Sequence, residues 1–300
     1  VSETPSAAAV GLVEPWATVE AAYSRRERRG LQPGGRLVVV ADPGVRPSEL
    51  SKLLAEAGPS RIEVVGEAAG IVGDRAEVTT LAQLEPGADD IIYFGSNAET
   101  VERLGALLGN GGLLCVVLGG ARLSRTVQLD VGRVHYDFVR YVGTTGDRPE
   151  DAYAWIPDSG EIRDGDRVAM IGAAGPMGLM HTMRAAVLGL DGLELTASDL
   201  SDERLAHLAA VVGPTAAERG VRLRVVNSAV EPLVPGYTYL TCLVPVPGVF
   251  AQTVALAGDG AIVNAFAGFP AGTLADLDLQ HIIENRVYLI GTSGSQMPDM

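Results

Sequence analysis

The fold is decided by residues 165–178, which read GDRVAMIGAAGPMG. A short apolar run at 168–171 is followed by a turn with glycine at positions 172, 175 and 178. In dinucleotide-binding folds such glycines allow a tight turn, let the backbone approach a pyrophosphate and let the next helix pack closely. The stretch therefore predicts a strand, a phosphate-binding turn and a helix whose N-terminal N–H groups face the phosphates.

An acidic residue further along supports a nucleotide site. Asp199 ends the apolar run 193–199 and lies 21 residues after Gly178. In Rossmann units an acid at the tip of the second strand accepts hydrogen bonds from the adenosine ribose hydroxyls. The same carboxylate would repel a 2′-phosphate, so the pattern favours NAD(H) over NADP(H). The alternative is a glycine turn retained only for packing.

Later segments complete the predicted cofactor site. Arg204 is expected to lie over the adenine, with a solvated helix position as the alternative. The proline-rich turn 244–248 is expected near the nicotinamide. Asn264 and Gly268 follow the fifth strand, where ligands bind in open α/β sheets. No catalytic residue is identified. The predicted cofactor-binding residues are Gly172, Ala174, Gly175, Pro176, Met177, Gly178, Asp199, Leu200, Arg204, Val244, Pro245, Ala267 and Thr292.

The chain carries an earlier copy of the same pattern. GGRLVVVADPG at 34–44 matches GDRVAMIGAAG at 165–175, and further on Gly112 matches Gly260 at a separation of 148 residues. Repeats of this length are domain-sized units. The first copy has Ala41 and Pro47 where the second has glycines of the turn. We therefore expect the second copy to bind the nucleotide and the first to have lost that ability.

The alternation of strands with helices fixes the expected fold class. Strands nearly continuous in Val, Ile and Leu predict parallel sheets covered on both faces. We expect an α/β protein with two tandem Rossmann-like doubly wound sheets, paired as an internal pseudo-dimer with one continuous sheet. Strands 138–143 and 286–291 would then be adjacent and antiparallel, which would cover an otherwise exposed sheet edge. The expected divisions are an N-terminal segment with a connecting helix (1–32), a degenerate Rossmann-like domain (33–146), a linker (147–164) and an NAD-binding domain (165–300).

Composition narrows the classes of partner. The 300 residues suit two domains, and 47% hydrophobic residues suffice for a core in each. A formal net charge of −14 argues against nucleic acid and anionic membranes as partners. Two cysteines in apolar runs indicate buried thiols. The N-terminal residues do not resemble a signal peptide, and we expect a cytoplasmic protein.

Several motifs together resemble the zinc-type medium-chain dehydrogenase/reductase family. They are Glu14-Pro15 in a helix, GGRLVVV, the GAAGPMGLM turn with Asp199, FAGFP at 266–270 and LIGTSGSQMPDM at 289–300. The segments at 93–120 and 131–145 look like the polyol and sugar-phosphate dehydrogenases, of the L-sorbose-1-phosphate reductase or sorbitol dehydrogenase type. The resemblance covers most of the chain but lacks the family's catalytic barrel domain.

The resemblance implies an oxidoreductase that uses NAD(H) on a polyol, a sugar phosphate or a related secondary alcohol or ketone. Zinc would be bound only with the missing catalytic domain, and Glu14 is the one residue that matches a position near that metal. We expect little activity from this chain alone. Two alternatives are a non-catalytic NAD-binding scaffold and an NAD-assisted epimerase-type reaction. A homo-oligomer is left open beside the internal pseudo-dimer.

Overall fold

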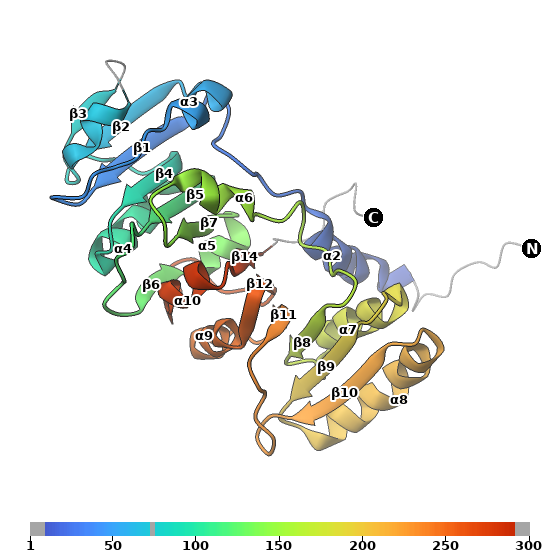
Figure 1. Ribbon diagram of the computed structural model, residues 1–300. Helices are drawn as coiled ribbons and strands as arrows, with labels where there is room; N and C mark the ends of the chain where they lie inside the picture. Colours follow the sequence, from blue (N-terminus) through green and yellow to red (C-terminus); the bar gives the residue numbers. More distant parts are fainter. Residues whose placement is uncertain (1–9, 73–75, 292–300) are drawn as a thin grey trace, which may run out of the picture.

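The computed structural model describes residues 10–72 and 76–291 of the chain. Each half contains a parallel six-stranded sheet (Figure 1), and both sheets have the strand order 3-2-1-4-5-6 of doubly wound nucleotide-binding folds. The predicted fold class is therefore confirmed. The first sheet comprises β1 (Arg36–Ala41), β2 (Arg61–Val65), β3 (Glu77–Thr79), β4 (Ala88–Phe94), β5 (Leu108–Val117) and β7 (Arg140–Thr144). The second comprises β8 (Arg167–Ile171), β9 (Glu194–Asp199), β10 (Arg222–Asn227), β11 (Tyr237–Cys242), β12 (Ala257–Asn264) and β14 (Tyr288–Ile290).

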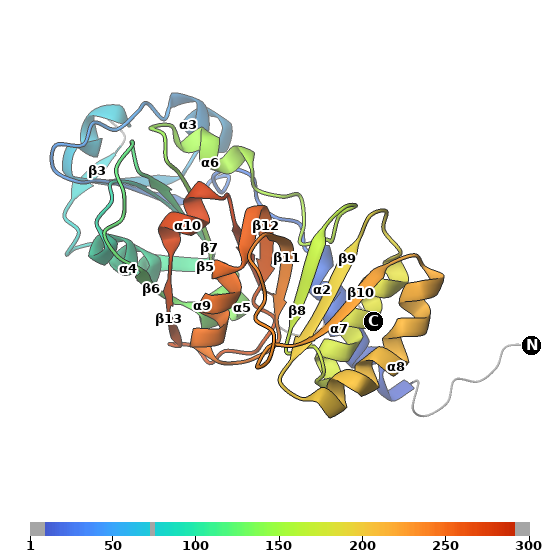
Figure 2. The same ribbon diagram turned by 60° about the horizontal axis from the view of Figure 1, so that its bottom comes forward.

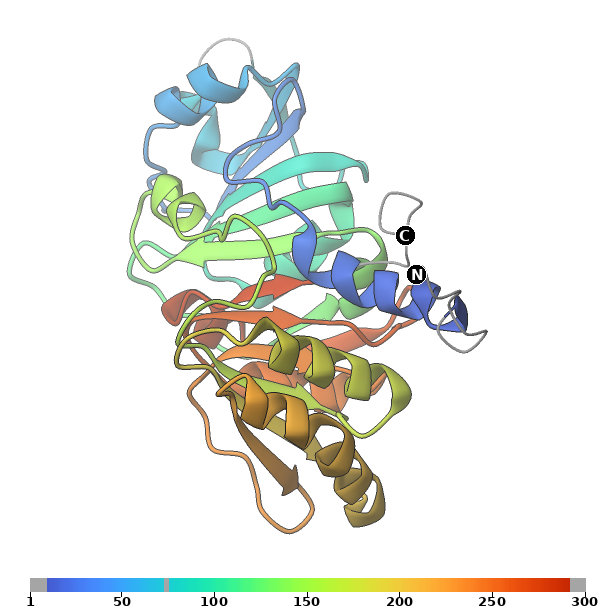
Figure 3. The ribbon, with the colours of Figure 1, turned by 90° about the vertical axis from the view of Figure 1, so that its right-hand side faces the viewer.

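Helices connect the strands and cover the faces of the sheets. In the first half they are α2 (Val13–Ser24), α3 (Ser51–Ala57), the 3-10 helix η1 (Gly66–Ile71), α4 (Ala98–Leu107), α5 (Val131–Tyr136) and α6 (Pro149–Ala154). In the second half they are α7 (Pro176–Leu188), α8 (Asp202–Glu218), α9 (Pro247–Ala255) and α10 (Leu279–Glu284). The connecting helix α2, blue in Figure 3, packs against α7 of the second half.

Two apolar layers form the core, one on each face of the sheets. Successive strand residues point to opposite faces, so Val39 lies in one layer while Val38 and Val40 lie in the other. Each layer continues from the first sheet into the second, because Val168 shares the layer of Val39 and Ala169 shares the layer of Val38. The two halves therefore share their core instead of burying separate ones.

An antiparallel ribbon joins the halves at their centre. Strand β6 (Val127–Asp130) of the first half pairs with β13 (Leu274–Leu277) of the second (Figure 2). Gln128 pairs with Asp276, and these two positions are 148 residues apart, like the repeat itself. The ribbon therefore has internal two-fold pseudo-symmetry with its axis at this pair.

Glycine contacts repeat the same symmetry. A Cβ added to Gly143 would lie 2.7 Å from Ile283, and a Cβ added to Gly291 would lie 2.7 Å from the Cα of His135. Gly291 lies 148 residues after Gly143, and Ile283 lies 148 residues after His135. The two contacts are therefore equivalent under the repeat, and each half makes its own copy of the same contact. Strands β7 and β14 lie side by side. Within the described residues the two sheets are not joined by hydrogen bonds, so the expectation of one continuous sheet was wrong.

Three local expectations are also corrected. Gly111, not Gly112, is the partner of Gly260, because both have a left-handed φ (72° and 66°) and both N–H groups bond the carbonyl that follows the next helix. The connecting helix expected within 1–32 ends at Ser24, and Arg28 after it bonds Asp90 instead of continuing the helix. The segment 147–164 contains α6, which packs on β5 and β7.

Candidate functional site

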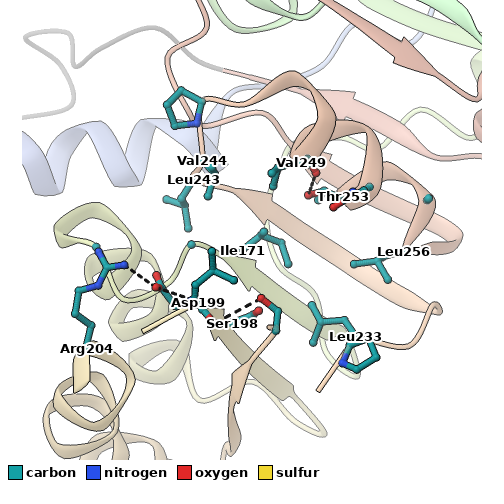
Figure 4. A pocket seen from close by; sticks show the side chains of 18 of the residues that line it. Ile171, Ser198, Asp199, Arg204, Leu233, Leu243, Val244, Val249, Thr253 and Leu256 are labelled. Carbon is teal, nitrogen blue, oxygen red and sulfur yellow. Dashed lines mark hydrogen bonds and ion pairs between the residues drawn. The ribbon is translucent and has the colours of Figure 1, made fainter. Parts of the chain in front are cut away.

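A cavity of about 870 Å³ opens at the carboxyl ends of β8, β9 and β11 (Figure 4). This is where the strand order of the second sheet reverses, and open α/β sheets bind ligands at such a point. The predicted residues that line the cavity are Gly172, Gly175, Asp199, Leu200, Arg204, Val244 and Pro245. Those that do not line it are Ala174, Pro176, Met177, Gly178 and Ala267. Thr292 lies outside the described residues.

Each glycine of the turn has a separate steric reason. Gly172 has φ 81°, and a Cβ there would lie 2.6 Å from the side chain of Val244. A Cβ on Gly178 would lie 2.4 Å from the carbonyl oxygen of Ala173, so only glycine lets α7 pack this closely on the turn. At Gly175 a Cβ would meet nothing closer than 3.8 Å, so this glycine leaves the backbone open toward the cavity.

The N-terminus of α7 keeps its backbone donors available. The first N–H groups of a helix have no partner inside the helix, and α7 starts with Pro176 after Gly175, without a side-chain cap. The neighbouring α8 differs, because Ser201 accepts a hydrogen bond from the N–H of Arg204 at 3.3 Å. A helix N-terminus with unused donors beside a glycine turn is suited to bind phosphate.

The carboxylate of Asp199 lies at the tip of β9 and is 8% exposed. It accepts hydrogen bonds from the backbone N–H groups of Ala174 (3.2 Å), Leu200 (2.8 Å) and Ser201 (3.2 Å). Arg204 donates to it as well, at 2.8 Å, and the Arg204 side chain is 58% exposed. The backbone thus fixes the acid, while its exposed partner faces the cavity.

The remaining walls are largely apolar and were missed by sequence reasoning. They come from the end of β8, the segment 228–235 and α9, as Figure 4 shows for Ile171, Leu233 and Val249. A flat aromatic base fits between such walls, because cofactor sites combine apolar lining with a few polar groups. The lining residues outside the predicted set are Ile171, Ser198, Ser228, Pro232, Leu233, Pro235, Leu243, Val249, Gln252, Thr253, Ala255 and Leu256.

The corresponding region of the first half is a polar hollow of about 470 Å³ beside Asp42, which differs from the apolar cavity of the second half. Asp42 follows β1 and accepts hydrogen bonds from the Tyr93 hydroxyl (2.6 Å) and the Ser96 N–H (3.3 Å). Helix α3 begins only at Ser51, away from the turn. The strand register places Gly66 at the position of Asp199, and the acid of the first half, Glu67, comes one residue later and accepts a hydrogen bond from the Gly44 N–H at 3.4 Å. These features support the expectation that the first half lost its nucleotide site.

His181 is buried beside the turn. Its Nδ1 lies 2.6 Å from the Tyr23 hydroxyl, and its ring contacts Phe266 edge-on. Burial, followed by the nearby Arg184, lowers the pKa of His181 to about 3. The histidine is therefore neutral at physiological pH and ties α7 to α2.

Glu14, the candidate neighbour of a metal, lies in the first turn of α2. The Thr18 hydroxyl donates to its carboxylate at 3.3 Å. Among the residues that the structure describes, no group of three or more His, Cys, Asp or Glu side chains is arranged to hold a metal ion. Within the same ranges, no helix is long and apolar enough to cross a membrane.

Comparison with solved structures finds alcohol dehydrogenases. The alcohol dehydrogenase zinc-binding domain protein of Burkholderia ambifaria is 22% identical, with a TM-score of 0.36, over 45% of this chain and 35% of that one. Benzyl alcohol dehydrogenase of Acinetobacter calcoaceticus is 20% identical (TM-score 0.37; 46% and 37%). Acetophenone reductase of Geotrichum candidum, in complex with NAD, is 19% identical (TM-score 0.35; 45% and 35%).

These matches are distant and partial. The aligned part spans little more than a third of those chains, so no residue role or activity is transferred from them. No protein-family model matches the sequence, and no curated protein matches it. The function must therefore be argued from the cavity itself.

Proposed function

We propose that the second half binds NAD(H) and acts as the cofactor-binding part of an oxidoreductase. Its substrate class would be a polyol, a sugar phosphate or a related secondary alcohol or ketone, and the bound nicotinamide would accept or give the hydride. The observation that carries the proposal is that Gly172, Gly175 at the start of α7, and Asp199 all line one apolar cavity.

The residues present fit a dinucleotide. Gly175 and the first N–H groups of α7 would hold the pyrophosphate, and Asp199 would accept hydrogen bonds from the adenosine ribose. Four donors already contact the Asp199 carboxylate, so a ribose hydroxyl would replace the exposed Arg204 rather than a backbone N–H. The freed guanidinium would then lie beside the adenine.

A non-catalytic NAD-binding scaffold is the second candidate. One observation favours it: among the described residues that line the cavity, only Asp199 and Arg204 have titratable side chains. Neither is placed as a general acid for a carbonyl, because both belong to the adenosine end. A cavity of this kind binds and orients the cofactor without itself supplying proton transfer.

Calorimetric titration with NADH and NADPH tests the cofactor assignment. We expect one NADH site per chain and weaker NADPH binding, and Asp199→Ala should weaken NADH binding by about tenfold or more, because charged hydrogen bonds are lost. The preference for NADH over NADPH should fall in the same variant, since the repulsive charge is gone.

Asp202→Ala is the matched control. Asp202 lies three residues after Asp199, accepts a hydrogen bond from Asn227 and does not line the cavity. This substitution should leave both affinities unchanged. Absence of NADH binding to the wild-type chain would contradict the proposal.

A further inference from the structure

Helix α5 of the first half packs against the loop 265–270, which follows β12 in the second half. His135 Nδ1 lies 2.8 Å from the carbonyl oxygen of Ala265. A Cβ on Gly132 would lie 2.4 Å from the carbonyl oxygen of Pro270, so helix and loop touch backbone to backbone. The Tyr136 hydroxyl lies 3.0 Å from the position that a Cβ on Gly268 would take. Three residues of α5 thus contact the loop 265–270.

The side chain of Tyr136 is itself held in place. The His135 and Tyr136 rings meet edge to face, with centroids 4.5 Å apart. Burial lowers the pKa of His135, although its hydrogen bond to the Ala265 carbonyl acts in the opposite direction. Tyr136 remains 46% exposed. The partly exposed side chain of Tyr136, from the first half, therefore lies against the loop 265–270 of the second half.

The loop lies on the side of the sheet that the adenosine cavity leaves free. The cavity covers the ends of β8, β9 and β11, whereas the loop 265–270 follows β12. A dinucleotide crosses the point where strand order reverses, so its second nucleotide lies over the later strands. The N–H of Ala267 bonds the carbonyl of Cys242 at 2.9 Å, which fastens the loop to the end of β11.

We propose that α5 of the first half completes the cofactor site of the second half, with Tyr136 as a positioning residue for the nicotinamide-bearing end. This inference rests on the proposed function of the second half. It gives the first half a direct part in the site. Figure 2 shows α5 between the first sheet and the strands of the second.

The pseudo-symmetry supplies a matched comparison. The position equivalent to Tyr136, 148 residues later, is Glu284 in α10. Glu284 faces the first half and pairs with Arg122, which is itself 148 residues before Pro270. At equivalent positions, the first half therefore has Glu284 in an ion pair with Arg122, whereas the second half has the partly exposed phenol of Tyr136.

Binding of NADH and of ADP-ribose separates the two ends of the cofactor. We expect Tyr136→Ala to weaken NADH binding by roughly three- to tenfold, the size of one lost contact. ADP-ribose, which lacks the nicotinamide, should bind the variant as it binds the wild type. Tyr136→Phe, which keeps the ring contact with His135, should retain most of the NADH affinity. Glu284→Ala should change neither ligand.

The outcomes are distinct. If the wild type binds neither NADH nor ADP-ribose, the proposed function fails. If both bind and Tyr136→Ala leaves the NADH affinity unchanged, the inference about α5 is overturned. Equal losses for NADH and ADP-ribose in Tyr136→Ala would also overturn it, because a general structural defect would then explain the change. Circular dichroism of each variant confirms that the chain is folded.

Discussion

The carboxylate of Asp199 has two kinds of hydrogen-bond partner, fixed backbone N–H groups and one exposed side chain. Three backbone N–H groups hold it within the turn, whereas Arg204 reaches it with a side chain that is 58% exposed. Because most of the Arg204 side chain is already in solvent, it can turn away from the carboxylate, which keeps its three backbone hydrogen bonds and its position for a ligand.

His181 makes the stability of the fold depend on pH. Its pKa is about 3 in the folded chain against 6.5 for an unperturbed histidine. The unfolded state alone takes up this proton as the pH falls from 6.5 toward 3, so stability is lost in that window. Between pH 6.5 and pH 5 we expect a loss of about 2 kcal/mol from this residue.

Urea unfolding at the two pH values measures that loss. His181→Gln should reduce the difference between pH 6.5 and pH 5, although it lowers stability at both. His207→Gln, at an exposed position of α8, should behave like the wild type. A His181→Gln variant with the same pH dependence as the wild type would contradict the assignment.

The two charged residues and the turn glycines that line the cavity could be predicted, whereas most of its other walls could not. Gly172 and Asp199 have few roles other than a turn and a charge at a strand end, so their spacing is informative. Leu233 and Val249 resemble any core residue in sequence. They line the cavity only because the segment 228–235 and α9 come together in space.

Among the elements, the connection from α2 to β1 carries a buried ion pair that fastens three segments. Glu27 pairs with Arg140 of β7 at 2.8 Å, with side-chain exposures of 5% and 4%. The Tyr288 hydroxyl of β14 donates to the same carboxylate at 2.7 Å. Burial opposes the charge of Glu27, but the charge and hydrogen bond of Arg140 and the hydrogen bond of the Tyr288 hydroxyl hold the pKa of Glu27 below its usual value.

Glu27→Gln should destabilise the chain strongly. It leaves the buried Arg140 guanidinium without a counter-charge, which costs about 3–5 kcal/mol. Arg29→Gln is the control, because its pair with Asp158 is exposed on both sides and should be worth no more than about 1 kcal/mol. Chemical denaturation of both variants checks the contrast, and equal losses would refute the structural role of Glu27.

The short elements of the interface escaped prediction for a physical reason. Strands β6 and β13 have four residues each and α5 has six, so none is long enough to show a clear hydrophobic period. Their conformations depend on each other across the halves, as the pairing of β6 with β13 shows. The long parallel strands, with their continuous Val, Ile and Leu, were readable in isolation.

At the scale of the whole molecule, the shared apolar layers predict cooperative unfolding. Both layers run through both sheets, so neither half can unfold without exposing the core of the other. Scanning calorimetry should show one transition with equal calorimetric and van't Hoff enthalpies. NADH at about 100 times its dissociation constant should raise the midpoint by about 5 °C as a single peak. Two peaks, of which NADH moves only one, would contradict this prediction.

The pair at the centre of the ribbon shows what fusion into one chain permits. In an assembly of two identical chains, a residue on the two-fold axis must face a copy of itself, and an aspartate there would face a second aspartate. Here Asp276 faces Gln128. Because both copies lie in one chain, equivalent positions can carry different residues, and the two crevices need not have the same lining. The two halves are arranged like the subunits of a two-fold dimer, but a mutation in one half is not repeated in the other.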